Sequence, residues 1–490
     1  MNNRTMIQYF EWELPSNQML WKIVGDKADK LKDAGFTDIW LPPAYKGMCG
    51  REDVGYGVYD MYDLGEFDQK GSIETKYGSK ADYIKAIDKL QNAGINVYAD
   101  IVFNHRMGAD GTEEVDAIET SDSNREEKIS GNEKITAWTK FEFPGRNGKY
   151  SKFKWNKSHF SGCDWDESSK RKSLFLFEGK EWNRETDDEK ANYDYLMGAD
   201  LDMDNEEVCE ELLNWGLWYE KITGVNGMRL DAVKHIKASF YRRWIEKMRK
   251  ETGKKLPCVG EYWSPDLNHL LNYLEEVDDD MMLFDVPLHF NFYHASKSGG
   301  AYNMRGIIAN SLITAKPKNA VTFVDNHDTQ PGQALETFVE SWFKPIAYGI
   351  ILLSEYGLPC VFYGDYYGLG HAGIPSVDAI KTLVRIRNDY AYGEETDYYD
   401  DDNVVGFVRK GDSTHKDSGL AVIFSDGSGG SKPMHIGSAF KGARMIDALN
   451  KCTETVIVDD KGFGNFRCEG GSISVWIKEE AYLKMQNKLD

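Results

Sequence analysis

GMRLDAVKH, residues 227–235, joins a short apolar run to a cluster of polar and charged residues. Three other stretches have the same form, with an apolar run that ends in polar side chains: DIVFNH (100–105), VGEYW (259–263) and FVDNHD (323–328). Continuous apolar runs are typical of parallel strands buried on both faces. In a barrel of such strands the carboxyl ends gather at one face, where catalytic groups lie. The four stretches therefore predict parallel strands that end at one polar rim.

Eight β-type runs alternate with amphipathic helical stretches over most of the chain. The predicted strands are Met6–Phe10, Asp38–Leu41, Asn96–Phe103, Gly227–Ala232, Pro257–Tyr262, Leu283–Pro287, Ala320–Val324 and Pro359–Tyr363. The predicted helices include Ala81–Ala93, Glu206–Ile222, Phe240–Met248 and Trp342–Tyr356. Eight strands with intervening helices predict an α/β fold, a (β/α)8 TIM barrel.

Two segments interrupt this alternation. Residues 104–206 are too long for a strand-to-helix loop and contain hairpin-like pieces such as KFEFPGRNGKYSKFKW (140–155). We expect them to form a small inserted β-rich domain after strand 3. Beyond residue 393 short alternating runs and Gly/Asp turns replace the helical pattern, which predicts an antiparallel β-sandwich over 394–490. The barrel then comprises residues 1–103 and 207–393.

Composition narrows the class of ligand. The 490 residues are 41% hydrophobic and carry a formal net charge of −21. This charge disfavours nucleic acid and anionic membranes as partners, because both need a basic surface. A net negative charge does not disfavour binding of a neutral polymer. The 13 Trp and 27 Tyr residues include flat rings that could stack on sugars, although barrel packing accounts for most of them.

The cysteines and the N-terminal segment indicate the cellular compartment of the protein. Seven cysteines lie at scattered positions without a CxxC motif or a Cys/His cluster, which favours neither a disulfide framework nor a zinc site. The segment MNNRTMIQYFEWELPSNQML has no basic region followed by an apolar one, and no apolar stretch of about 18 residues occurs. We therefore expect a cytoplasmic protein; an export signal removed from the sequence would leave the same pattern.

Carboxyl groups at three of the predicted strand ends suit glycoside hydrolysis. That reaction needs one ionised carboxylate and one protonated carboxyl group on either side of the scissile bond. Asp231 lies two residues after Arg229 and so on the same face of the strand, where the guanidinium favours the ionised carboxylate. Glu261, among apolar and aromatic neighbours, is expected to have a raised pKa and to donate the proton.

Asp328, beside His327, supplies a third carboxylate that could bind sugar hydroxyls and stabilise positive charge. Each feature alone is compatible with a structural role, since an Arg-x-Asp pair on a strand is more often a structural ion pair. The three acids together at three strand ends are difficult to obtain by chance.

These segments resemble the four conserved regions of the α-amylase family of glycoside hydrolases (family 13), in particular its bacterial liquefying and cytoplasmic members. The resemblance also covers QYFEW (8–12), WLPPAYKG (40–47), VGYGVYDMYDLGEFDQKGSIETKYG (54–78) and GGSISVW (470–476), and spans nearly the whole chain. It implies endo-acting, retaining hydrolysis of internal α-1,4-glucosidic bonds in starch, glycogen or maltodextrins. It also implies Asp231 as nucleophile, Glu261 as general acid/base and Asp328 as transition-state stabiliser, with the first two carboxyls roughly 5–5.5 Å apart.

The resemblance further implies substrate contacts. Arg229, His105 and His327 match positions that contact the sugar at the cleavage point, and Tyr56 matches the residue that stacks under it. Lys234, His235 and Trp263 match positions on the leaving-group side.

Calcium is the expected cofactor. The insert ends in a dense acidic run that includes Asp194, Asp200, Asp202 and Asp204, and oxygen-rich clusters suit Ca²⁺. The resemblance favours one structural ion bound by Asn104, Asp194, Asp200 and the carbonyl of His235. Some secreted relatives bind additional metals through acids where this chain has Ser161 and Asn183. We therefore expect the additional sites to be absent or weak.

Two alternatives remain. Cyclodextrinases, maltogenic hydrolases and transglycosylases use the same acids, but often carry an N-terminal β-domain, whereas the first strand here begins near residue 6. A non-catalytic carbohydrate-binding protein built on such a barrel is the second alternative. We expect an α-glucan substrate and a monomer, while the preferred glucan and its product lengths are not readable from the sequence.

Overall fold

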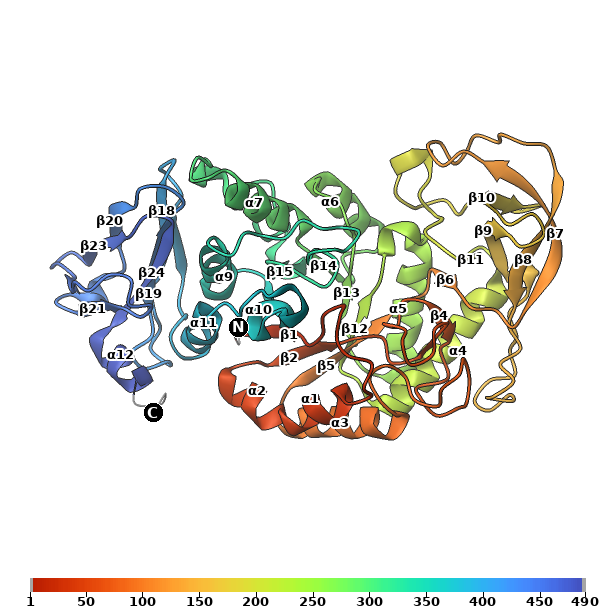
Figure 1. Cartoon of the computed structure of the whole chain (residues 1–490). Helices are drawn as coiled ribbons and strands as arrows, with labels where there is room; N and C mark the ends of the chain where they lie inside the picture. The colour runs from red at the N-terminus through yellow and green to blue at the C-terminus, as the bar shows by residue number, and fades with distance from the viewer. Residues whose placement is uncertain (1–2, 487–490) are drawn as a thin grey trace.

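Eight parallel strands close into a barrel in the computed structural model, which describes residues 3–486 (Figure 1). Around the barrel the order is β1, β16, β15, β14, β13, β12, β5 and β2. Their bounds are β1 Met6–Gln8, β2 Asp38–Leu41, β5 Asn96–Ile101, β12 Gly227–Leu230, β13 Cys258–Gly260, β14 Met282–Phe284, β15 Ala320–Phe323 and β16 Leu358–Phe362. Nearly all of these strand residues are buried, as apolar runs covered on both faces require. The predicted fold class is confirmed, and every predicted barrel strand overlaps an observed one.

Helices between the strands cover the barrel. They are α1 Leu20–Asp26, α2 Ala28–Ala34, α3 Lys80–Asn92, α4 Glu206–Thr223, α5 Ala238–Thr252, α6 Leu267–Glu276, α7 Val286–Lys297, α8 Leu312–Ala315, α9 Lys344–Leu353, α10 Tyr363–Tyr367 and α11 Ala379–Asp389. Local sequence sets their ends, as α4 illustrates. The Asn205 side chain accepts a hydrogen bond from the Glu207 amide at the start, and Gly224 adopts φ +64° at the end.

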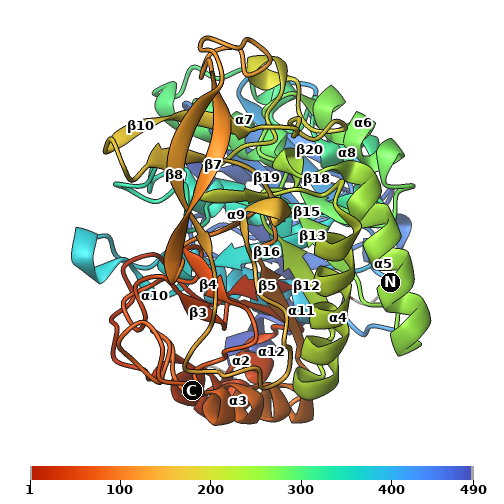
Figure 2. The same ribbon diagram turned by 90° about the vertical axis from the view of Figure 1, so that its right-hand side faces the viewer.

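A six-stranded antiparallel sheet occupies the long interruption after β5. Its order is β6, β11, β9, β10, β7 and β8, with bounds β6 His105–Arg106, β7 Gly111–Thr120, β8 Glu133–Lys140, β9 Phe160–Asp166, β10 Arg171–Phe177 and β11 Ala199–Leu201. Beside it a small hairpin, β3 Lys46–Gly47 and β4 Val58–Asp60, follows β2. Figure 2 shows the long β7–β8 ribbon in front of the barrel when the insert faces the viewer.

The C-terminal part consists of antiparallel strands. A six-stranded sheet has the order β17 Glu395–Tyr398, β18 Val404–Arg409, β19 Leu420–Ser425, β24 Ser472–Lys478, β21 Arg444–Asp447 and β22 Val456–Ile457. The pair β20 Gly430–His435 and β23 Phe463–Cys468 packs on it around Val408, Phe466 and Trp476. Figure 1 shows this part and the inserted sheet on opposite sides of the barrel.

Three sequence predictions about elements were wrong. Residues 140–155 form no hairpin of strands beyond the end of β8; the buried Arg146 ties this loop to Asp60 across 86 positions of sequence, with 2.8 Å between Nε and Oδ2. The helix expected over Trp342–Tyr356 is the shorter α9, because Pro345 stands in its first turn. The C-terminal part also contains a helix, α12 Glu479–Gln486, which packs Ala481 and Met485 against the core.

None of the helices formed by residues 3–486 is long and apolar enough to span a membrane.

Candidate active site

Parallel pairing brings the predicted carboxylates together at the ends of neighbouring strands. β12 pairs with β13 so that Leu230 lies opposite Gly260, and the next residues along each strand are Asp231 and Glu261. The backbone continues the ladder there, because the Glu261 amide donates to the Leu230 carbonyl at 2.9 Å. On the other side β12 places Arg229 opposite Asp100 of β5. One strand register thus gathers three acids and one guanidinium.

The Arg229 guanidinium is the centre of this group. Its Nη1 donates to Asp231 Oδ1 at 2.6 Å and to Asp100 Oδ1 at 2.8 Å, while its Nη2 donates to Glu261 Oε2 at 2.9 Å. The Arg229 side chain is 1% exposed. One buried cation therefore faces three carboxyl groups, and the excess negative charge favours a proton on at least one of them.

Glu261 is suited to hold that proton. Burial, together with the nearby Asp231, raises the pKa of Glu261 to about 7, against the opposing effect of Arg229. The direction agrees with the sequence prediction. The Ala232 amide donates to Glu261 Oε2 at 3.1 Å, and Ala232 adopts the left-handed value φ +48°. Strained backbone of this kind is found at functional sites.

Asp328 projects from a tight turn after β15. The Asn326 side-chain oxygen accepts from the amides of Asp328 and Thr329, both at 2.9 Å. The Asp328 side chain is 24% exposed, against 11% for Asp231 and 9% for Glu261, so solvent reaches all three acids. Burial and the negative charge of Glu261 raise the pKa of Asp328.

His327 is oriented toward Asp328 by a hydrogen bond from the opposite side of its ring. The Gln8 side-chain nitrogen lies 3.0 Å from His327 Nδ1, and Nε2 lies 3.4 Å from Asp328 Oδ2. Because the Gln8 amide nitrogen is a donor, Nδ1 accepts and Nε2 carries the hydrogen. Burial and Arg229 lower the pKa of His327, so the ring is neutral.

Stacked aromatic rings lie beside the acidic side chains. Tyr56 stacks on His327 with centroids 5.1 Å apart, and Trp12 lies parallel to Tyr56 at 5.7 Å. The Tyr56 hydroxyl donates to Asp100 Oδ2 at 2.8 Å, and its carbonyl lies 2.8 Å from His105 Nε2. Parallel rings beside polar groups are an arrangement suited to binding a sugar.

The residues predicted for the leaving-group side contact other groups. Lys234 Nζ pairs with Glu189 at 2.9 Å, and His235 Nδ1 lies 2.6 Å from the Tyr193 carbonyl. Trp263 packs against Phe290 with centroids 6.1 Å apart. The contacts of Lys234 and His235 join the barrel rim to the 187–195 segment of the insert, whereas Trp263 packs on α7 of the barrel. None of these contacts involves the three acids.

Sequence reasoning missed Asp100, Trp40 and Gln8. Asp100 Oδ2 accepts from Tyr56 and also from Trp40 Nε1 at 3.0 Å, and burial raises the pKa of Asp100 to about 6. The signal was present in DIVFNH, where an acid precedes the apolar run of a strand that pairs with the Arg229 strand. Gln8 gave no such signal, since its contact with His327 spans 319 positions.

Two of the expected calcium ligands, Asn104 and Asp200, lie beside the paired strands β6 and β11. Asn104 Nδ2 lies 3.3 Å from Asp200 Oδ1, and Asp194 accepts from Asn183 Nδ2 at 2.9 Å. Asp200 Oδ2 and Asn183 Oδ1 are buried without a hydrogen-bond partner. Burial raises the pKa of Asp194 to about 7 and that of Asp200 further above its usual range. Two buried carboxylates beside unsatisfied oxygens fit a cation.

Residues 3–486 contain no group of three or more His, Cys, Asp or Glu side chains arranged to hold a metal ion. The predicted set relies on two carboxylates and completes its shell with amide and carbonyl oxygens. Ser161 is buried at this place, and Lys180 Nζ pairs with Asp202 Oδ2 at 2.6 Å.

The site and the barrel have counterparts among known proteins. The family described as "Alpha amylase, catalytic domain" matches residues 20–383. The chain belongs to the α-amylase family of glycoside hydrolases. It is 53% identical over 478 residues to an α-amylase of Geobacillus stearothermophilus, covering 97% of this chain and 87% of that protein. It is 42% identical to a cytoplasmic α-amylase of Escherichia coli (strain K12), over 98% of this chain and all of that protein.

Solved structures share the fold. The α-amylase of Geobacillus thermoleovorans in complex with acarbose superposes with a TM-score of 0.63 at 18% identity, over 97% of this chain and 98% of that one. As a member of the α-amylase family the chain is a glycoside hydrolase of the α-amylase type. Retaining, endo-acting hydrolysis of α-1,4-glucans is the reaction of this family.

Proposed function

We propose that the chain hydrolyses internal α-1,4 bonds of starch-like glucans with Asp231 as nucleophile, Glu261 as general acid/base and Asp328 as transition-state stabiliser. The observation that supports these roles is the contact of Asp231 and Glu261 with the two nitrogens of one guanidinium, together with the raised pKa of Glu261. Arg229 Nη1 donates to Asp231 at 2.6 Å, and burial raises the pKa of Glu261 and so favours its protonated form.

The reaction then proceeds in two steps. Asp231 attacks the anomeric carbon while Glu261 transfers its proton to the leaving glycosidic oxygen, so that the C–O bond breaks as the glycosyl ester forms. Glu261, now ionised, removes a proton from water, and the resulting hydroxide displaces Asp231 from the anomeric carbon. Two inversions give net retention. Asp328 stabilises the positive charge that develops on the sugar ring in both steps.

The remaining predicted residues bind the chain of sugars. Tyr56, His105 and His327 contact the sugar at the cleavage point in this proposal. They lie in one contact network with Asp100 and Asp328, which supports that role. Lys234, His235 and Trp263 belong on the leaving-group side.

We also propose a division into three domains. Residues 1–103 and 207–393 form the catalytic barrel, 104–206 the insert and 394–490 the C-terminal β-sandwich. The first range contains the barrel and the β3–β4 hairpin, the second the six-stranded sheet of the insert, and the third the six-stranded sheet and the β20–β23 pair.

Calcium is proposed as the structural cofactor, because members of this family commonly bind it and the buried donor set suits it. Asn104, Asp194, Asp200 and the His235 carbonyl would hold the ion, whose charge would compensate the two buried carboxylates. Its place is structural, and no step of the reaction depends on it.

We propose a reducing compartment, the cytoplasm, and a monomeric state. All seven cysteines are unpaired, six of them buried, which suits a protein that does not depend on disulfides. Detection of the activity in a periplasmic or culture fraction of the source organism would contradict this location.

Digestion of a long α-glucan tests the proposed function. Following product lengths over time, and the anomeric configuration of new ends by NMR, should show a mixture of oligosaccharides with α-configured reducing ends. Early maltose alone, or cyclic products, would favour the cyclodextrinase or transglycosylase alternative. Unchanged glucan degradation by the Asp231→Asn protein would instead show that the strand-end acids are structural.

A further inference from the structure

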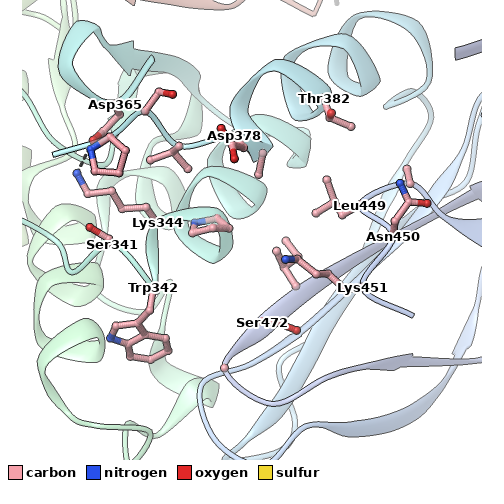
Figure 3. A pocket seen from close by; sticks show the side chains of 18 of the residues that line it. Ser341, Trp342, Lys344, Asp365, Asp378, Thr382, Leu449, Asn450, Lys451 and Ser472 are labelled. Carbon is pink, nitrogen blue, oxygen red and sulfur yellow. Dashed lines mark hydrogen bonds and ion pairs between the residues drawn. The ribbon is translucent and has the colours of Figure 1, made fainter. Parts of the chain in front are cut away.

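A buried group of three charges lies behind the turn that carries Asp328. Asp325 is the second residue after β15, Lys344 is the first residue of α9 and Asp365 lies in α10. Lys344 Nζ is 2.8 Å from Asp325 Oδ2 and also pairs with Asp365 Oδ1, and all three side chains are at most 1% exposed. Figure 3 shows the Lys344–Asp365 pair at one wall of a cavity.

The three charges are held by further contacts. The Tyr348 hydroxyl donates to Asp365 Oδ2 at 2.7 Å, and Lys344 Nζ lies 3.4 Å from the centroid of the Phe338 ring. A buried ammonium with two buried carboxylates is expensive to desolvate, and apolar residues of similar volume are often at least as stabilising. The group therefore calls for an explanation other than stability alone.

Asp325 connects this group to the catalytic turn. Its Oδ1 accepts from the Thr329 hydroxyl at 2.9 Å, and that hydroxyl in turn accepts from the Asn326 amide at 3.0 Å. The Asn326 side chain then accepts from the amide of Asp328 itself. These hydrogen bonds fix the backbone of the turn on both sides of Asp328, and the Lys344–Asp325 ion pair anchors the turn to α9.

Asp365 lies on the other side of the ammonium. It lines a cavity of about 590 Å³ between α9, α11 and the C-terminal part, whose walls include Leu449 and Ile473 (Figure 3). The two carboxylates therefore contact the same cation, but only Asp325 belongs to the turn of Asp328.

We propose that Lys344 is a positioning residue for the hydrolytic reaction, which acts through Asp325 to hold the Asp328 carboxylate at the place where charge develops on the sugar. This inference rests on the proposed role of Asp328. Displacements of about 1 Å at a catalytic group cost up to 10²-fold in rate, so the anchor should affect turnover far more than substrate affinity.

Asp325→Asn and Asp365→Asn form a matched pair of test variants. Each removes one negative charge from the same ammonium and keeps the size of the side chain. We expect Asp325→Asn to lower kcat at least tenfold with KM changed less than twofold, and to weaken binding of a positively charged, flattened-ring inhibitor by a similar factor. Asp365→Asn should keep kcat within twofold, although both variants melt at a lower temperature than the parent.

Lys344→Met provides a second test if Asp325→Asn fails to fold, and we expect it to lower kcat as well. Lys344→Arg, which keeps the positive charge, should recover part of the kcat that Lys344→Met loses. Equal kcat values for the two Asn variants would overturn the proposal, because the group would then be structural only. Asp328→Asn separates the two levels of inference. If it keeps its turnover, the proposed role of Asp328 is wrong; if it loses turnover while Asp325→Asn and Lys344→Met do not, only the positioning proposal is wrong.

Discussion

At the scale of single residues, the chemistry depends on an unequal division of charge around Arg229. One guanidinium meets Asp100, Asp231 and Glu261 at hydrogen-bonding distance in a buried place. A single cation cannot neutralise three carboxylates, so the excess negative charge favours a proton on at least one of them. The pKa of Glu261, raised to about 7, marks it as a proton carrier, while Asp231 receives the shortest of the three bonds.

Replacing Glu261 tests the proton transfer directly. Glu261→Gln keeps the volume and an oxygen that can accept from Ala232, but it cannot donate a proton to a leaving group. We expect kcat to fall by about 10²–10⁴-fold, while the affinity for oligosaccharides changes little, because proton donation acts in the transition state. Steady-state kinetics of the variant measures kcat, and calorimetry measures its affinity for oligosaccharides. Lost affinity with near-normal turnover would contradict the assigned role.

The pH dependence follows from the same group. The folded protein favours protonated Glu261, since its pKa is raised from the ordinary 4.5 to about 7. Its contribution to folding stability is therefore full below pH 4.5 and is lost as the pH rises through 7. The proton needed for catalysis is lost over the same range, so kcat/KM should fall above pH 7.

A pH–rate profile checks this expectation against a matched variant. Glu276 is an exposed carboxyl on α6 whose pKa is also raised by partial burial, and Glu276→Gln should leave the profile unchanged. A basic limb that stays near pH 7 in a Glu261→Gln protein with residual activity would assign the proton to another group.

At the scale of elements, local sequence patterns predicted the barrel strands. They did not predict the segments and site residues whose structure depends on contacts between distant parts of the chain. The barrel strands could be predicted because each is a continuous apolar run, and their polar ends indicated the catalytic rim. The loop at 140–155 could not be predicted, because the spacing of its buried aromatic residues Phe141, Phe143 and Trp155 resembles that of a strand. Its actual structure depends on the contact of Arg146 with Asp60, which is distant in sequence. Asp100 and Gln8 became visible as site residues only when strand pairing showed what lies beside them.

The packing of β24 on α9 provides a test at this scale. Gly349 of α9 leaves room for Ile473, and a methyl group at position 349 would lie 2.0 Å from Ile473 Cδ1. A Gly→Ala change inside a helix usually stabilises by about 1 kcal/mol. Here we expect Gly349→Ala to destabilise by about 1–3 kcal/mol, because the packed core cannot accept the extra atom.

Urea unfolding of four proteins decides this point. They are the parent, Gly349→Ala, Ile473→Ala and the double variant. If the collision is the cause, the double variant should lose clearly less than the sum of the two single changes. Additive losses, or a more stable Gly349→Ala protein, would show that α9 and β24 are not packed as described.

At the scale of the whole molecule, the insert and the barrel are joined near the active site. Asn104 follows barrel strand β5, Asp200 lies in β11 of the insert, and His235 follows Asp231, the proposed nucleophile, by four residues. The Asp187 amide donates to the Lys234 carbonyl at 2.9 Å, which ties the same two parts together. A cation at these residues would therefore stabilise the junction on which the proposed substrate contacts of Lys234 and His235 depend.

Calcium removal tests this junction. We expect metal analysis after dialysis to find one tight Ca²⁺ per chain, and a chelator to lower the melting temperature reversibly. A ligand that binds only the folded protein and is present at 100 times its Kd stabilises folding by about 2.7 kcal/mol. We expect removal of calcium to lower the free energy of unfolding by a similar amount. Asp200→Asn should reduce both the bound calcium and the response to the chelator.

Asp204→Asn is the matched control for that experiment. Asp204 belongs to the same acidic run, but it is exposed and paired with Lys237 at 2.6 Å. Its replacement should leave the calcium content and the chelator response unchanged, because a surface ion pair contributes at most about 1 kcal/mol. Two or more tight ions per chain would show that Ser161 and Asn183 do not prevent additional sites. Equal responses of the Asp200 and Asp204 variants would place the ion elsewhere in the acidic run.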